Sequence, residues 1–277
     1  MTALHRTQTT QEWSRSRAID ETALAKMLQL VQENPSLEPM RRSGIVRGYA
    51  VRVAELALIV DKDEARARAH FLLAAEFASR MIRTRELPAP MRITELRPEY
   101  SPDTGKDYLV PIERMETLGG ARMSFADFSH AFFTLWSFGS DEALREAAMV
   151  PQAEYSSPGL EVPDWGHRFM NGEKALARGA LSEGISEMLS VLDSLSPAQR
   201  AIALCAQAAL RSDSGQFNAH LVAGLKLNKK EAAKRPGALE GLIWHSGMML
   251  CRIALRHGIR VPDQNYLPLR FAPWFSK

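Results

Sequence analysis

The sequence has few of the features that mark secreted, membrane or disulfide-rich proteins. Its 277 residues contain only two cysteines, Cys205 and Cys251, and both lie in apolar stretches of helical character. A cysteine in such a setting behaves as a small hydrophobic residue, so we expect two buried thiols and no disulfide framework. The polar N-terminus lacks the apolar segment of a signal peptide. The most apolar stretch contains Glu240, His245 and Arg252, which favours a core helix over a membrane span. We therefore expect a cytoplasmic protein.

Sequence motifs for metal sites, phosphate-binding loops and nucleophilic serines are also absent. No two of the seven histidines stand at H-x-x-x-H spacing, and there is no C-x-x-C, G-x-x-x-x-G-K-[ST] or G-x-G-x-x-G. The segment His245-Ser246-Gly247 does not match the G-x-S-x-G elbow of serine hydrolases. We interpret His245 as a hydrogen-bonded core histidine, with a ligand or base as the alternative. The sequence thus predicts no catalytic residue, no metal and no cofactor.

Net charge is only +3, which excludes binding to nucleic acid through bulk charge. The charge is unevenly spread along the chain, however. The net charge is +3 over residues 1–83, −6 over 84–163 and +6 over 164–277. An acidic middle between basic flanks is the clearest electrostatic asymmetry.

Helical periodicity dominates what the sequence does contain. Apolar residues at spacings of three and four predict helices over 19–32, 40–60, 62–83, 124–138, 141–149, 165–177, 181–192, 197–211, 216–226 and 237–257. Short turns between successive segments predict antiparallel helical hairpins, with Asp61 as the cap of the third helix. The expected fold is all-α, a multi-helix bundle of about ten helices around one contiguous core.

The segment 237–257 is the most apolar and is expected at the centre of that core. Gly241 and Gly247 within it predict the close approach of a neighbouring helix. Arg252 and the basic residues that follow suit the negative C-terminal end of this helix. The extended tail over 259–277 ends in aromatic residues, which should fold back onto the domain.

We expect one compact unit with four recognisable parts. Residues 1–18 form a flexible N-terminal arm, and 19–150 form an N-terminal helical half. A linker over 151–163 leads to a C-terminal helical half over 164–277, which includes the tail.

Residues 84–120 form a long Pro/Gly-rich insertion in the N-terminal half. Five prolines break any helix there, and Ile93 and 108–110 fit only short strand pieces. Loops of this length are usually functional or disordered, so this acidic insertion is the candidate partner-binding site. The candidate residues are Glu99, Tyr100, Asp103, Asp107, Tyr108, Glu113 and Glu116. A solvated loop without a binding role stays as the alternative.

Three runs in the C-terminal third carry a resemblance to a known family. They are FNAHLVAGLKL (217–227), GLIWHSGMMLCRIALRHGI (241–259) and VPDQNYLPLRF (261–271). An apolar helix, Gly-Ile and an extended Tyr-Leu-Pro segment together resemble the immunity protein 49 family of bacterial polymorphic-toxin systems. The resemblance covers residues 165–271, and before that only the order of the helices is similar.

The resemblance implies a cytosolic antidote without catalytic residues. Such a protein binds a cognate toxin domain, often one delivered by contact-dependent machinery such as type VI secretion, and blocks its active site or substrate path. If the acidic insertion is the contact surface, the toxin should present a basic face. The implied partner is a protein, not nucleic acid or membrane. Two alternatives stay open, namely a helical-repeat adaptor or chaperone-like protein for a non-toxin partner, and an enzyme of an unrecognised all-helical type.

Overall fold

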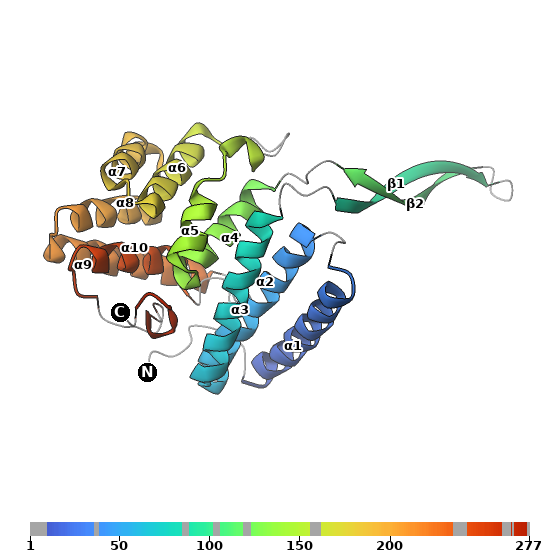
Figure 1. Ribbon diagram of the computed structural model, residues 1–277, viewed down its shortest axis with the longest axis horizontal. Coiled ribbons are helices and arrows are strands. Elements are labelled where there is room, and N and C mark those ends of the chain that lie inside the picture. Colours follow the sequence, from blue (N-terminus) through green and yellow to red (C-terminus); the bar gives the residue numbers. More distant parts are fainter. Residues whose placement is uncertain are drawn as a thin grey trace.

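The computed structural model describes residues 10–35, 39–84, 89–101, 106–118, 123–155, 162–234, 243–261, 267 and 269–275. Within these ranges the chain forms ten α-helices and one two-stranded β-hairpin. The helices pack into a bundle, and the hairpin projects from it (Figure 1). The predicted all-α multi-helix bundle is thereby confirmed. None of the described helices combines the length and the apolar character that crossing a bilayer requires.

The N-terminal half consists of α1 to α5 and the hairpin. Its helices are α1 (Thr10–Glu33), α2 (Pro39–Leu56), α3 (Glu64–Arg83), α4 (Phe125–Phe138) and α5 (Asp141–Ala148). Because α1 begins at Thr10, the second half of the predicted flexible arm is helical, and residues 1–9 lie outside the described residues. A single π-helical turn, η1 (Ala57–Asp61), extends α2. Asp63, not Asp61, caps α3, and its carboxylate accepts the backbone N–H of Arg66 at 3.0 Å.

The C-terminal half is built from two antiparallel helical hairpins and a central helix. The helices are α6 (Asp164–Arg178), α7 (Leu181–Ser190), α8 (Pro197–Leu210), α9 (Ser214–Ala233) and α10 (His245–Arg256). Ser196 and Gln199 form the capping box that starts α8, as the Ser-Pro pair predicts. In the α6–α7 pair the backbones touch, since a Cβ on Gly172 would lie 2.7 Å from the Gly184 carbonyl oxygen.

Helix α10 packs between α4 and α8 and is largely buried, as expected from its apolar sequence. All residues from Gly247 to Ala254 are buried, and the buried Cys205 and Cys251 are not joined by a disulfide. The helix begins later than predicted, however. Trp244 has an extended conformation (φ −91°, ψ 89°) and precedes the first helical residue, while residues 235–242 lie outside the described residues.

The Trp244 side chain also explains why residue 247 is a glycine. A Cβ on Gly247 would lie 2.3 Å from the Trp244 ring and 2.6 Å from Leu267. On the facing helix, a Cβ on Gly224 would lie 2.4 Å from the same ring. The close approach predicted at Gly247 therefore exists, but a tryptophan ring and the tail make it, not a neighbouring helix. Gly241 lies outside the described residues.

Replacing Gly247 with alanine should destabilise the protein by about 2 kcal/mol, because the new methyl group overpacks the Trp244 site. Gly48→Ala is the matched control, since a Cβ on this α2 glycine meets nothing within 4 Å. It should stabilise the protein by up to about 1 kcal/mol through helix propensity alone. Urea unfolding measures both values, and a neutral or stabilising Gly247→Ala would contradict this reading of the contact.

The hydrophobic interior is divided into two clusters, which differs from the single core expected. The larger cluster spans α2 to α10 and the tail, and the smaller one joins α1, α2 and α3 through residues such as Leu24, Val46 and Phe77. Helices α2 and α3 contribute to both clusters and connect them. The tail folds back as predicted: Leu267, Leu269 and Phe271 are buried.

Candidate partner-binding hairpin

The insertion predicted as a loop is a long antiparallel β-hairpin. Strand β1 (Ala89–Ser101) pairs with β2 (Lys106–Leu118) along their whole length, and four residues connect them. At about 3.3 Å per residue, each strand extends about 40 Å. The hairpin leaves the bundle beyond the ends of α3 and α4 and points away from the C-terminal half (Figure 1). Ile93 and residues 108–110 do lie in strands, as expected, but these strands are long and paired, so the expectation of a loop with short strand pieces is wrong.

The strand register brings together four of the seven candidate residues. Glu99 pairs with Tyr108, and Tyr100 pairs with Asp107, next to the connection between the strands. The two residues of a pair share one face of the ribbon. Successive pairs alternate between the faces, so these two neighbouring pairs lie on opposite faces. Asp103 belongs to the connection over 102–105, outside the described residues.

The register separates the other two candidates from this group. Glu113 pairs with Thr94 and Glu116 with Met91, nearer to the helical body. Five residues of β2 separate Glu113 from Tyr108, which corresponds to about 17 Å. The seven candidates therefore do not form one surface, and the residues near the tip are the group that a partner could contact together.

The hairpin carries charges of both signs, which corrects the expectation of an acidic surface. The two strands contain five acidic residues and four basic ones, the latter being Arg92, Arg97, Lys106 and Arg114. The negative charge of residues 84–163 resides mainly further along the chain. There Asp141 pairs with two arginines of α10, and Glu146 pairs with Arg83. A basic partner face is therefore no longer implied by the hairpin alone.

All three prolines within the two strands stand at the same type of pair in the strand ladder. Pro90, Pro98 and Pro111 pair with Thr117, Leu109 and Leu96, and all three pairs share the same parity along the ladder. Antiparallel pairs alternate between hydrogen-bonded and non-hydrogen-bonded types, and proline has no N–H to donate. The ladder tolerates these prolines only at non-hydrogen-bonded pairs, where the backbone groups point to the outer edges. Both free edges of the ribbon thus lack some of their backbone N–H donors, which disfavours the pairing of a further strand from a partner protein.

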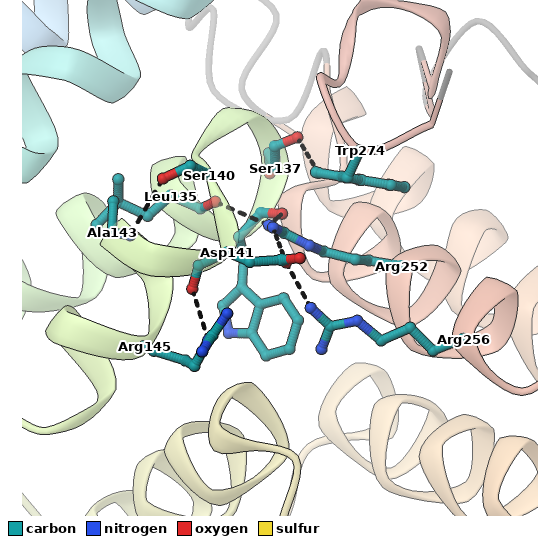
Figure 2. A network of polar contacts seen from close by, with 10 residues as sticks. Leu135, Ser137, Ser140, Asp141, Ala143, Arg145, Arg252, Arg256 and Trp274 are labelled. Carbon is teal, nitrogen blue, oxygen red and sulfur yellow. Dashed lines mark hydrogen bonds and ion pairs between the residues drawn. The ribbon is translucent and has the colours of Figure 1, made fainter. Parts of the chain in front are cut away.

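The helical body contains a buried polar network centred on Arg252 of α10 (Figure 2). Its guanidinium donates to the carbonyl oxygens of Leu135 (3.2 Å) and Trp136 (3.0 Å) and to Asp141 Oδ1 (2.5 Å). It also lies over the Trp274 ring at 5.4 Å. Arg252 was expected to serve the end of its own helix, but it satisfies the C-terminal carbonyls of α4 instead. The network fastens α10 and the tail to the α4–α5 corner.

The pKa values in this network reflect ion pairing under partial burial. Burial lowers the pKa of Arg252 to about 10, and Asp141 opposes that shift. For Asp141 burial disfavours the charged form, but the bonds and charges of Arg252 and Arg256 outweigh it and hold its pKa below the ordinary value. The residues drawn in Figure 2 are bonded to one another, so the arrangement indicates a structural role.

A second buried group holds the end of α5. The Lys174 Nζ donates to the Val150 carbonyl oxygen (2.5 Å) and lies 5.1 Å from the centre of the Tyr155 ring. Burial lowers the pKa of Lys174 to about 8. Arg178, one turn further along α6, donates to the Ala148 carbonyl oxygen at 3.2 Å. Two cations thus cap the C-terminus of α5, which favours this helix through its dipole.

His245 is a hydrogen-bonded core histidine, as predicted. Its Nδ1 lies 2.8 Å from the Ser137 Oγ, and its ring meets Phe138 edge-on at 6.0 Å. Burial, followed by the charges of Arg47 and His130, lowers its pKa to about 4. The ring is therefore neutral at physiological pH.

Among the described residues, no three His, Cys, Asp or Glu side chains are grouped as metal ligands. The hairpin thus remains the candidate functional element, and its long paired strands and its basic residues are the features that the sequence reasoning missed. The sequence Ser-Pro-Asp-Thr-Gly-Lys-Asp between two tyrosines was the signal that could have revealed the hairpin. No family model matches the chain, and comparisons with curated proteins and with solved structures likewise gave no significant match.

Proposed function

We propose that the chain is a non-enzymatic binding protein that neutralises a cognate antibacterial toxin in the cytoplasm and contacts it with the β1–β2 hairpin. The observation that carries this proposal is the hairpin itself, which projects from a closely packed helical body (Figure 1). A two-stranded hairpin is only marginally stable in water by itself. An element of this length outside the core is best explained by a partner that covers it.

The dimensions of the hairpin favour insertion into a cleft. With strands about 4.8 Å apart, the ribbon is about 10 Å wide and offers about 400 Å² on each face. A standard protein interface buries about 800 Å² on each partner, so a partner must contact both faces to reach that size. Because prolines interrupt both edges, the contacts fall on the faces of the ribbon. Insertion between two walls of a toxin would also obstruct its active site or substrate path.

The resemblance of residues 165–271 to immunity proteins supports a toxin as the partner. A helical-repeat adaptor or chaperone-like protein is the second candidate function. The observation in its favour is the succession of antiparallel pairs α6–α7 and α8–α9, which is typical of helical-repeat scaffolds. An adaptor would bind through the surface of these helices and would not require the hairpin.

Co-expression with the candidate toxin encoded next to this chain tests the proposal, and rescue of growth is the expected result. A variant with Glu99, Tyr100, Asp107 and Tyr108 replaced by alanine should lose at least tenfold in affinity, because the four residues surround the tip of the ribbon. The melting temperature of this variant should stay unchanged, since the hairpin projects from the helical body (Figure 1).

The matched control alters exposed acidic residues of the body, with Glu76→Ala on α3 and Asp193→Ala in η3 (Leu192–Ser194). These changes should leave rescue and affinity as they are. Toxin binding that survives the tip variant would exclude the hairpin as the contact element. Failure of rescue by the parent chain would exclude the toxin as the partner.

A further inference from the structure

A half-buried arginine at the junction of α2, α4 and α10 has no ionic partner in the described part of the chain. Arg47 of α2 makes one hydrogen bond there, from Nη1 to the Thr134 Oγ1, and its length of 3.5 Å is at the limit of such a bond. The Arg47 Nε is buried without a partner. Burial lowers the pKa of Arg47, and Asp127 acts in the opposite direction without forming an ion pair. The guanidinium therefore has unused donors.

The residues around Arg47 form one stripe along α4. His130, Thr134 and Ser137 are spaced by four and three residues and so share a face of the helix. Thr134 contacts Arg47, and Ser137 contacts the His245 Nδ1, which leaves Nε2 as the other ring nitrogen of His245. His130 is exposed, Arg47 and His245 are half-buried, and the two hydroxyl residues are buried. The junction is thus open to solvent at one end.

The electrostatics of this junction are unusual for a half-buried site. Arg47 and His130 both act on the charge of His245, so three nitrogen-bearing side chains lie within electrostatic range of one another. The carboxylate that acts on Arg47 belongs to Asp127, and it is engaged by the Ser124 hydroxyl at 2.7 Å. A partly desolvated cation without a counter-charge is unfavourable, and an added anion would relieve that penalty.

We propose that the α2–α4–α10 junction binds a small oxyanion, and specifically a phosphate group, between Arg47 and His245. The guanidinium supplies paired donors that match the oxygen spacing of a phosphate. The Thr134 hydroxyl already donates to the His130 carbonyl oxygen at 2.7 Å, and the Ser137 hydroxyl donates to the Phe133 carbonyl oxygen at 2.9 Å. The His245 Nδ1 therefore carries the ring proton and donates to Ser137, so the Nε2 lone pair accepts the O–H of a singly protonated phosphate. This site is separate from the hairpin and does not rest on the proposed toxin binding.

Thermal unfolding in sodium phosphate, against sodium chloride at equal ionic strength, tests the site. The melting temperature of the full chain should rise saturably, by about 3 °C at ten times the dissociation constant. Arg47→Met should abolish this response. It should also raise the melting temperature in phosphate-free buffer, because it removes an uncompensated charge.

Two further variants separate the site from general charge effects. Arg68→Met removes an exposed arginine of α3 and should leave the phosphate response unchanged. Asp127→Asn removes the competing carboxylate and should tighten phosphate binding several-fold in calorimetry. This variant tests the site even if Arg47→Met fails to fold. Equal responses in the parent, Arg47→Met and Asp127→Asn proteins would overturn the proposal. A response to sodium acetate as large as that to phosphate would assign the site to carboxylates and overturn the phosphate assignment.

Discussion

Replacing Arg252 with methionine is expected to destabilise the protein by about 4 kcal/mol, because two buried carbonyl oxygens each lose a hydrogen bond to a charged donor, worth about 2 kcal/mol apiece. The side chain is 2% exposed, and its loss leaves the Leu135 and Trp136 carbonyl oxygens without this donor. Methionine fills a similar volume, so the effect measures polar contacts more than a cavity. The melting temperature should fall by about 10 °C in thermal unfolding.

Arg256→Met provides a matched control, because both arginines donate to the same Asp141 oxygen at 2.5 Å. The Arg256 side chain is 40% exposed, so water replaces the lost pair and the expected change stays below about 1 kcal/mol. Similar changes in unfolding free energy for the two substitutions would mean that the burial of Arg252 contributes nothing to stability. They would contradict the structural role of the network.

The order and type of the helices were predictable because periodicity and caps are local signals. Ser124, Ser140 and Ser196 each cap a helix at the place where the sequence suggests one. The buried faces were harder to predict. Ile45 and Leu72 stand at the apolar spacing that predicts an inward-facing residue, yet they are 37% and 40% exposed.

Alanines take the place of these large residues in the interior. Ala50, Ala54, Ala74 and Ala78 are buried where α2 and α3 meet, because close helix contact requires small side chains. A prediction based on large apolar residues therefore assigns the wrong buried face to two helices that pack through alanine.

The start of α10 and the form of the insertion were mispredicted for different physical reasons. Trp244 lies within the helix predicted over 237–257, but its ring is held between Gly224 and Gly247 in a tertiary contact, and the helix starts after it. In the insertion, the prolines were interpreted as helix breakers that left room only for short strand pieces. They exclude helix, yet a two-stranded ribbon has free edges on both sides that accept them.

Of the candidate site, the sequence located the segment but not its surface. The pairing of Glu99 with Tyr108 depends on a register that the hairpin sets as a whole. Contacts of the helical body were out of reach for the same reason. Arg252 reaches Leu135 across 117 residues of sequence, and Arg47 reaches Thr134 across 87. Such pairs follow from the packing of whole helices and have no local signal.

The second large effect concerns Glu173 of α6, a carboxylic acid in the interior. It is 1% exposed, and both carboxyl oxygens are buried without a hydrogen-bond partner in the described structure. Burial raises its pKa from 4.5 to about 8. Between these values the folded state retains a proton that the unfolded state has lost, so this group lowers stability as pH rises through the window. At pH 7 the penalty amounts to about 3 kcal/mol.

Glu173→Gln removes the ionisable group and keeps the shape of the side chain. The variant should match the parent near pH 5 and exceed its unfolding free energy by about 3 kcal/mol at pH 7, as measured by urea unfolding. The quantity to compare is the difference in unfolding free energy between variant and parent. His245, whose pKa is lowered to about 4, makes both proteins less stable as pH falls, and the difference removes this shared effect. Measurements should stop at pH 8, where Lys174 begins to titrate in the folded state.

The control for this experiment is Glu183→Gln on α7. Its side chain is 61% exposed and pairs with Arg178 at 3.2 Å, so its removal should change stability by less than about 1 kcal/mol at every pH. A Glu173→Gln curve that runs parallel to the parent curve from pH 5 to pH 8 would show that Glu173 ionises normally. In that case water or a neighbouring donor must reach the carboxylate, and α6 would be less closely packed against the core than its burial indicates.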